Sequence, residues 1–198
     1  MNRPANGLLL SLMVASMLVA CGKREEKAPA ASAGSDPLVV KIGAASPLTG
    51  PQAHIGIDIR NGTQLGVDDV NAAGIEVGGR KVKLELIAED DEANPTKATT
   101  VAQKLVDAKV VAVVGHFNSG ASIPASKIYS DAGIVQISPG STNPKYTQQG
   151  FKTTYRVVAN DDQQGPVGAQ FAVEKLVAKK IAVIDDSTAY GQGLANAF

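Results

Sequence analysis

Two loops rich in hydroxyl groups are the parts of this sequence best suited to bind a small molecule. The first, GHFNSGA, contains Ser119 and is followed directly by Ser122, and the second, SPGSTNP, contains Ser141 and Thr142. Each follows a short aliphatic run, and neither contains Lys or Arg. Hydroxyls and the free backbone N–H groups of a helix start can bind a carboxylate without a cation. The pattern predicts a pocket for a small anion; the alternative is that Ser119 and Ser122 only cap a helix.

Catalytic motifs are weak by comparison. His54 and His116 are isolated from each other in the sequence, and a lone loop histidine is more typical of a surface or structural position. FNSGA lacks the leading Gly of the G-x-S-x-G nucleophile motif. No Walker motif occurs, and GQGLAN lacks the third Gly of the dinucleotide fingerprint. We expect no catalytic residue and no cofactor; a Rossmann-like enzyme is a remote alternative.

The charged residues do not indicate a metal or a nucleic acid. Four Asp-Asp pairs occur, and the segment EDDE at 89–92 could bind a cation. Acidic residues at strand ends and helix starts are usually solvated or capping, and no His or Cys cluster lies nearby, so no metal site is expected. Lys plus Arg and Asp plus Glu both number 19. That balance gives no reason to expect a nucleic-acid partner.

The polar loops need a scaffold that brings them to one edge, and the hydropathy pattern predicts one. Strand-like and helix-like segments alternate, which favours an α/β fold with a parallel sheet flanked by helices. In such sheets ligands bind beyond the carboxyl ends of the strands, where both polar loops lie. The expected strands are residues 38–46, 82–90, 110–115, 134–138, 153–158 and 180–185.

Local signals predict the helices between these strands. Asn94 and Pro95 are a cap followed by a proline suited to the first helical position. Pro124 and Pro166 are expected in the first turns of later helices. On the first helix, the apolar face is expected to include Gly62 and Gly66, which would let it approach the sheet closely. The residues expected to be buried on the later helices are Ala98, Val101, Ala102, Leu105, Ala125, Ile128, Tyr129, Ala169, Ala172, Val173 and Leu176.

The first 36 residues are expected to lie outside the folded domain. Residues 1–20 contain an apolar run typical of a signal peptide and too short for a comfortable membrane span. The run ends in LVAC, which resembles a bacterial lipobox, so Cys21 is predicted to carry lipid; a plain secretory signal is the alternative. Residues 21–36 are predicted to be a lipid-anchored flexible tether. Because Cys21 is the only cysteine, no internal disulfide is expected.

Four segments together resemble the periplasmic leucine/isoleucine/valine-binding proteins, the substrate-binding subunits of branched-chain amino-acid ABC importers. They are AASPLTGPQAHIGIDIRNGTQLGVDDVNAAGI, EDDEANPTKA, VVGHFNSGASIPASKIYSDAGIVQISPGSTNP and DQQGP with IAVIDDSTAYGQGLA. The resemblance implies a type I periplasmic binding protein fold, in which two hinged lobes close on a ligand without catalysis. It implies that residues 37–160 form the first lobe and residues 161–198 an incomplete start of the second.

The resemblance also assigns roles to loop residues. It implies that Ser119 holds the carboxylate of a bound amino acid and that Gly140 and Thr142 contact the amino-acid head. Ser141 lies between them and is included in the predicted site. It further implies that Tyr190, in the second lobe, packs over the ligand.

Three departures from the family pattern affect these expectations. Ile55 stands where the opening loop often supplies an aromatic wall, which puts the side-chain preference in doubt. Ala93 and Asn118 occupy the positions that classical members join by a disulfide. The family also needs a chain roughly twice as long, so we interpret the sequence as truncated, with the acidic residue for the ligand's amine beyond Phe198.

The expected function is therefore that of an exported, monomeric solute-binding protein. It would capture a small amino acid, branched-chain or otherwise aliphatic, and deliver it to ABC permease subunits in the membrane, which it would contact only through its lipid anchor. One alternative is a ligand-sensing input domain for an amide or amino-acid receptor. A fused membrane helix or DNA-binding segment would favour that alternative.

Overall fold

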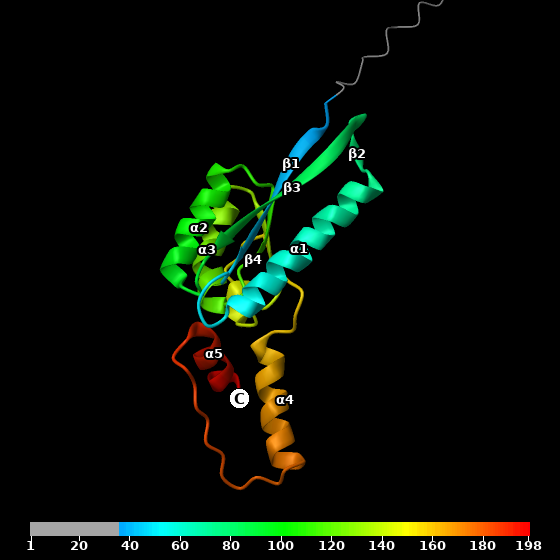
Figure 1. Cartoon of the computed structure of the whole chain (residues 1–198). Helices are drawn as coiled ribbons and strands as arrows, with labels where there is room; N and C mark the ends of the chain where they lie inside the picture. Colours follow the sequence, from blue (N-terminus) through cyan, green and yellow to red (C-terminus); the bar gives the residue numbers. More distant parts are fainter. Residues whose placement is uncertain (1–35) are drawn as a thin grey trace, which may run out of the picture. The chain divides into compact units, whose positions relative to one another are not determined.

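A six-stranded sheet forms the centre of the computed structural model, which describes residues 36–198 (Figure 1). The predicted signal peptide, Cys21 and nearly all of the predicted tether lie outside the described residues. The strand order is β2-β3-β1-β4-β5-β6. Every neighbouring pair is parallel except β2 with β3. The strands are β1 (Leu38–Ser46), β2 (Glu76–Val77), β3 (Arg80–Asp90), β4 (Ala112–Gly115), β5 (Val135–Ser138) and β6 (Thr154–Arg156).

Helices cover both faces of this sheet (Figure 1). Helices α2 and α3 pack against each other on one face, and α1 lies on the opposite face, because right-handed crossovers in the two directions from β1 place them there. The helices are α1 (Ala53–Ala73), α2 (Pro95–Asp107), α3 (Ser119–Asp131), η1 (Pro144–Tyr146), α4 (Asp161–Glu174) and α5 (Ala189–Ala197). Within residues 36–198, no helix is both long and apolar enough to cross a membrane.

The hydrophobic core lies between α2, α3 and the sheet. Leu105 of α2, Val113 of β4 and Tyr129 of α3 are fully buried in it. The four predicted core positions of α2 are all buried. Asn94 caps this helix as predicted, because its side-chain oxygen accepts hydrogen bonds from the N–H groups of Thr96 (2.9 Å) and Lys97 (3.0 Å).

The face of α1 that packs on the sheet differs from the predicted face by a shift of about one residue along the helix. Gly62 and Gly66 are exposed with open space beside them, whereas Gly56 and Val67 are buried. One residue corresponds to about 100° around a helix, so the two exposed glycines point away from the sheet. Gly56 makes the close approach instead, because a Cβ there would overlap the carbonyl of Pro47.

The predicted first turns of α3 and α4 also need correction. Both helices begin five residues before the proline that was expected to open them, at Ser119 for Pro124 and at Asp161 for Pro166. An asparagine precedes each helix at the N-cap position. Asparagine is among the preferred N-cap residues, although neither of these two side chains makes a capping hydrogen bond. Each proline then lies inside its helix and removes one backbone donor.

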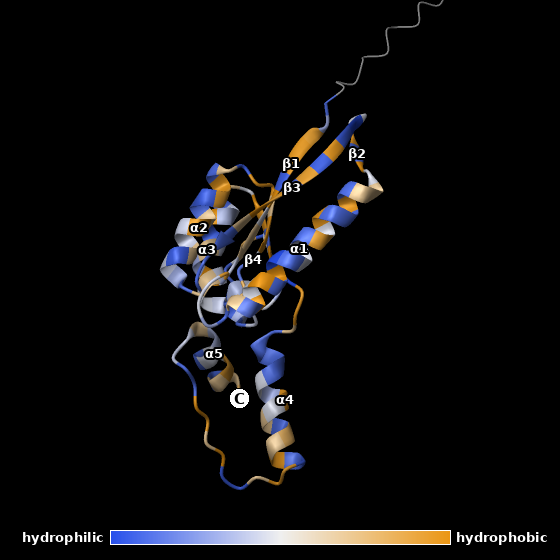
Figure 2. Cartoon of the chain, in the orientation of Figure 1, coloured by the Kyte–Doolittle hydropathy of each residue, from blue (hydrophilic) through white to orange (hydrophobic). Residues whose placement is uncertain are grey.

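The part of the chain after Asp161 differs most from prediction. Residues 180–185 form no strand, because a strand requires a hydrogen-bonded neighbour and this segment has none among the described residues. Val173 of α4 and Leu176, which follows the helix, are exposed rather than buried, and Ala169 and Ala172 are only half-buried. Figure 2 shows hydrophobic residues along the segment between α4 and α5. Gly165 of α4 allows a close approach to Ala197 of α5, because a Cβ at this position would overlap it.

Candidate functional site

A cavity of about 690 Å³ lies at the carboxyl edge of the sheet. Its wall is built from the loops that follow β1, β3, β4 and β5, together with the start of α5. The lining residues are Gln52, Ala93, Pro95, Phe117, Asn118, Ser119, Gly120, Gly140, Thr142, Asp186, Ser187, Thr188, Ala189 and Tyr190. Four of the residues predicted from the sequence, Ser119, Gly140, Thr142 and Tyr190, are therefore brought together in one wall.

Ser119 is placed to donate into this cavity from the first residue of α3. Its hydroxyl oxygen accepts the backbone N–H of Asn143 at 3.2 Å, which joins the α3 start to the loop after β5. A hydroxyl also carries one hydrogen to donate. Asn118 precedes the helix without capping it through its side chain, so the first N–H groups of α3 supply further donors beside that hydroxyl.

Thr142 contributes a hydroxyl that has no hydrogen-bond partner among the described residues. Its Oγ1 is buried and makes no hydrogen bond within residues 36–198. An unsatisfied buried polar group costs about 1–3 kcal/mol, so an acceptor brought by a ligand would remove a penalty that the free protein carries. The guanidinium of Arg156 fixes the backbone on both sides of Thr142 by donating to the carbonyls of Ser141 (2.8 Å) and Asn143 (3.1 Å).

Gly140 leaves its backbone open at the cavity because no side chain fits there. A Cβ at this position would overlap the ring of Phe117, which lines the same wall. The sequence analysis did not identify Phe117 as a wall residue.

Ser141 and Ile55 are not among the lining residues. The buried hydroxyl of Ser141 has its acceptors within the protein, since both the carbonyl of Phe117 (3.0 Å) and Ser122 Oγ (2.6 Å) lie within reach of its one hydrogen. Ile55 lies on α1 and is half-buried, while Gln52, one turn earlier, occupies the wall.

Two amide side chains in the wall were missed by the sequence analysis. Asn118 donates from Nδ2 to Gln52 Oε1 at 2.8 Å, and its own Oδ1 is buried without a partner among the described residues. The pair joins positions 66 residues apart. The only signal in the sequence is that both residues lie in polar loops that follow strands.

The segment that precedes α5 contributes a negatively charged side chain to the cavity wall. Asp186 is the one acidic residue among the lining residues of the described chain, and none of them is Lys or Arg. The Thr188 hydroxyl, at 2.6 Å, and the Thr188 N–H, at 3.0 Å, both donate to Asp186 Oδ1. The hydrogen bond from the Thr188 hydroxyl is the largest of the causes that lower the pKa of Asp186. This carboxylate is therefore ionised at neutral pH.

Tyr190 is carried to the cavity by α5. The tyrosine is 40% exposed. Asn143 ties this helix to the loop after β5, because its Nδ2 donates to the carbonyl of Ala189 at 2.7 Å.

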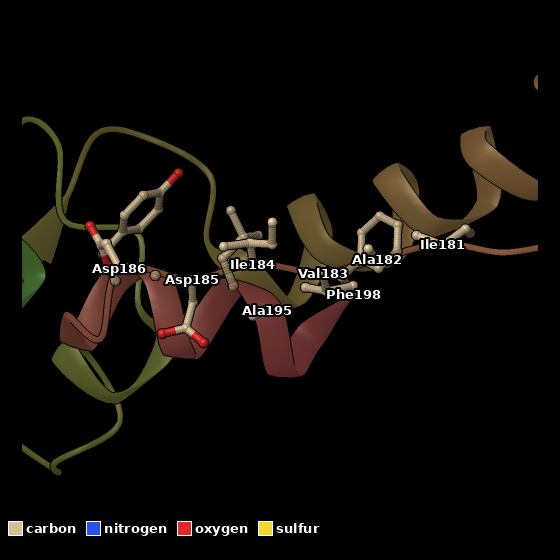
Figure 3. Close-up of a pocket in the computed structure, with 11 residues that line it drawn as sticks. Ile181, Ala182, Val183, Ile184, Asp185, Asp186, Ala195 and Phe198 are labelled. Atoms are coloured by element: carbon tan, nitrogen blue, oxygen red, sulfur yellow. The ribbon is translucent and has the colours of Figure 1, made fainter.

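A second, smaller cavity of about 460 Å³ is of a different kind. It lies between the extended segment 181–186 and α5, and Figure 3 shows Val183, Ile184 and Phe198 along it. Ile184 is 91% exposed. Aliphatic and aromatic side chains dominate its wall, so it lacks the convergent polar donors of the larger cavity. Within residues 36–198, no group of three or more His, Cys, Asp or Glu side chains is arranged to hold a metal ion.

Comparison with known proteins identifies the family. Residues 39–198 match the family described as "Periplasmic binding protein". The chain belongs to the periplasmic binding protein family. Membership of this family implies an exported, periplasmic protein.

The relatives within the family are amino-acid-binding proteins by name. The chain is 48% identical over 159 residues to an "Amino acid binding protein" of Pseudomonas aeruginosa, and the match covers 80% of this chain and 42% of that one. It is 45% identical over 157 residues to "Leu/Ile/Val-binding protein homolog 1" of Brucella abortus, with 79% and 42% covered. The chain thus spans about 42% of the length of these relatives.

A solved structure supports the same family assignment. The branched-chain amino acid transporter substrate-binding protein LivJ of Streptococcus pneumoniae, in complex with isoleucine, superposes with a TM-score of 0.72 at 33% identity. That match covers 80% of this chain and 45% of LivJ. The resemblance to leucine/isoleucine/valine-binding proteins and the α/β fold class of type I periplasmic binding proteins are both confirmed.

Proposed function

We propose that the protein carrying this sequence captures a small amino acid, branched-chain or otherwise aliphatic, and delivers it to an ABC permease. The observation that carries the proposal is the convergence of Ser119, Thr142 and the start of α3 on one cavity without a Lys or Arg in its wall. The names of the relatives support the ligand class. Binding without catalysis is proposed for the same reasons.

The cavity offers complementary groups for both charges of an amino acid. In this proposal the carboxylate accepts from the Ser119 and Thr142 hydroxyls and from the N–H groups at the start of α3. Charge-assisted hydrogen bonds of this kind are stronger than neutral ones. The ionised Asp186 in the same wall is proposed to favour the ammonium group, in addition to the acidic residue expected beyond Phe198. Phe117, Pro95 and Ala93 supply apolar surface for the side chain.

The cavity is proposed to lie between two lobes, with a hinge at residues 158–161. Residues 37–160 would form the first lobe and residues 161–198 the start of the second. Ser119, Gly140 and Thr142 would then belong to one lobe, and Asp186 and Tyr190 to the other. Closure of the second lobe over the ligand would exclude water and strengthen each hydrogen bond to the carboxylate. The permease would recognise this closed form.

A lipid anchor on Cys21 is proposed from the LVAC motif. Mass spectrometry of the mature protein should find a lipid-sized mass increment on Cys21, and Cys21→Ser should release the protein from membranes. A native N-terminus downstream of Cys21 would exclude the anchor.

A thermal-shift panel of free amino acids tests the ligand class on the full-length gene product. A ligand present at 100 times its dissociation constant stabilises a protein by about 2.7 kcal/mol. Leucine, isoleucine and valine should raise the melting temperature, and acidic or basic amino acids should not. No shift with any aliphatic amino acid would contradict the proposed function.

A further inference from the structure

A buried aspartate–histidine pair lies directly behind the cavity wall. Asp91 Oδ2 and His116 Nδ1 are 2.6 Å apart, and the other ring nitrogen of His116 lies 3.2 Å from the hydroxyl of Tyr129. All three side chains are fully buried, and none lines the cavity. The sequence analysis considered acidic residues here as solvated or capping, so the pair was not predicted.

Two hydrogen-bond partners hold the His116 ring, one at each nitrogen. Burial, and the nearby Asp91 charge, raise the pKa of Tyr129, so its hydroxyl keeps its proton. The Tyr129 hydroxyl and the Asp91 carboxylate each lie within hydrogen-bond distance of one ring nitrogen of His116; with the hydroxyl donating to Nε2, Nδ1–H donates to the carboxylate. The ring is thereby held from both sides, and the backbone of residue 116 is held with it.

The backbone carbonyl of His116 is a junction between two cavity loops. It accepts the hydroxyls of Ser138 (2.6 Å) and Ser122 (2.9 Å). Ser138 Oγ in turn accepts the N–H groups of Ser141 (2.9 Å) and Gly140 (3.3 Å). The loop that presents Gly140 is therefore hydrogen-bonded to the backbone just before Phe117 and Asn118.

Asp91 adds a third loop to this junction. Its Oδ1 accepts the N–H of Ala93 at 2.9 Å, and its backbone N–H donates to the carbonyl of Ser46 at 3.2 Å. Ala93 lines the cavity. The side chain of Asp91 therefore joins the loop after β3 to the loop after β4 through His116.

We propose that Asp91, His116 and Ser138 are positioning residues that hold the three loops of the ligand cavity in their binding geometry before the ligand arrives. The proposal rests on the proposed function, because it assigns these loops to the amino-acid site. Loops that are already ordered incur no ordering penalty on binding. Hydrogen bonds to an ionised group shielded from water hold that order most strongly.

Two buried serines provide a matched test. Ser138→Ala removes the bonds that join the two cavity loops. Ser126→Ala removes an equally buried serine of α3, which donates to the carbonyl of Ile123 (2.7 Å) and accepts from Gln149 (2.8 Å), away from the cavity. In titrations of the full-length gene product with L-leucine, Ser138→Ala should raise Kd about fivefold, as expected for one neutral hydrogen bond. Ser126→Ala should stay within twofold of the parent.

A second pair of variants tests the contact between Asp91 and His116. Asp91→Asn keeps the shape but removes the charge, and should raise Kd for L-leucine at least about tenfold. Tyr129→Phe removes the other hydrogen bond of the same imidazole but leaves the contacts of Asp91 with His116 and with the Ala93 N–H, so it should raise Kd less than Asp91→Asn does. Should Asp91→Asn fail to fold, the two serine variants decide the question without it.

Amide hydrogen exchange separates this inference from the proposed function. In ligand-free protein, Ser138→Ala and Asp91→Asn should speed exchange in residues 116–122 and 139–143, and Ser126→Ala should leave it unchanged. If the parent protein binds no amino acid, the proposed function is wrong, but the hydrogen-exchange measurement still tests the positioning role. Unchanged exchange in these loops, or binding by Ser138→Ala and Asp91→Asn within twofold of the parent, would overturn the inference.

Discussion

Replacing Thr142 by valine should separate ligand affinity from stability in an unusual way. Most buried polar side chains have partners in the folded protein, so their removal lowers stability. The Thr142 hydroxyl has no hydrogen-bond partner within residues 36–198, yet it lies in the cavity wall. Valine keeps the branched shape and removes only the hydroxyl. The free protein should therefore be as stable as the parent or more stable.

The expected loss of affinity follows from the proposed bond to the ligand carboxylate. A hydrogen bond to a charged group contributes about 1.5–3 kcal/mol. Each 1.4 kcal/mol corresponds to about a tenfold change in dissociation constant. Thr142→Val should therefore weaken binding of L-leucine by about 10- to 150-fold. Ser119→Ala should weaken binding similarly but also lower stability, because the N–H of Asn143 would lose its acceptor.

Thr154 is a matched control for this experiment. Its hydroxyl is also buried without a partner among the described residues, but it lies on β6 and does not line the cavity. Thr154→Val should match Thr142→Val in its effect on stability and leave affinity unchanged. Isothermal titration gives the affinities and urea unfolding the stabilities. If Thr142→Val binds leucine within twofold of the parent, the carboxylate is held elsewhere.

Three further predictions concern the cavity wall, the core and pH. Gly140→Ala should weaken leucine binding at least tenfold in titrations, because its Cβ overlaps the Phe117 ring and must displace it. Leu105→Ala should lower the free energy of unfolding by about 2–5 kcal/mol in urea titrations, because Leu105 is fully buried in the core, without changing the cavity. Burial raises the pKa of Asp90, but hydrogen bonds from the Thr49 hydroxyl and from backbone N–H groups outweigh it and hold the pKa below 3.8. A depressed native pKa stabilises the fold above the unfolded value, so unfolding midpoints should fall as pH drops below about 4, and Asp90→Asn should flatten that dependence.

The sequence predicted best those features that depend on neighbouring residues. The bounds of β1, the Asn94 cap and the buried face of α2 agree with expectation, because each follows from local hydropathy or local hydrogen bonding. The order of polar loops along the chain also predicted that Ser119, Gly140 and Thr142 meet at one edge. Parallel strands bring their carboxyl ends together whatever lies between them.

The remaining features depend on partners that are distant in the sequence. The contact of Asn118 with Gln52 and that of His116 with Asp91 join residues 66 and 25 positions apart, and no local pattern indicates either one. The expected strand at 180–185 failed for a related reason. Its aliphatic residues carry a strand-like pattern, but pairing depends on a neighbouring strand that the described residues do not supply.

Titration of the full-length gene product with L-leucine and with L-leucinamide tests the central claim most directly. The two ligands share the side chain and the amine, but leucinamide lacks the carboxylate that Ser119, Thr142 and the start of α3 are proposed to hold. The expected result is one leucine bound per chain, with leucinamide weaker by 100-fold or more, as the loss of a few charge-assisted hydrogen bonds implies. Equal affinity for the two, or no binding of leucine, isoleucine or valine, would contradict the account.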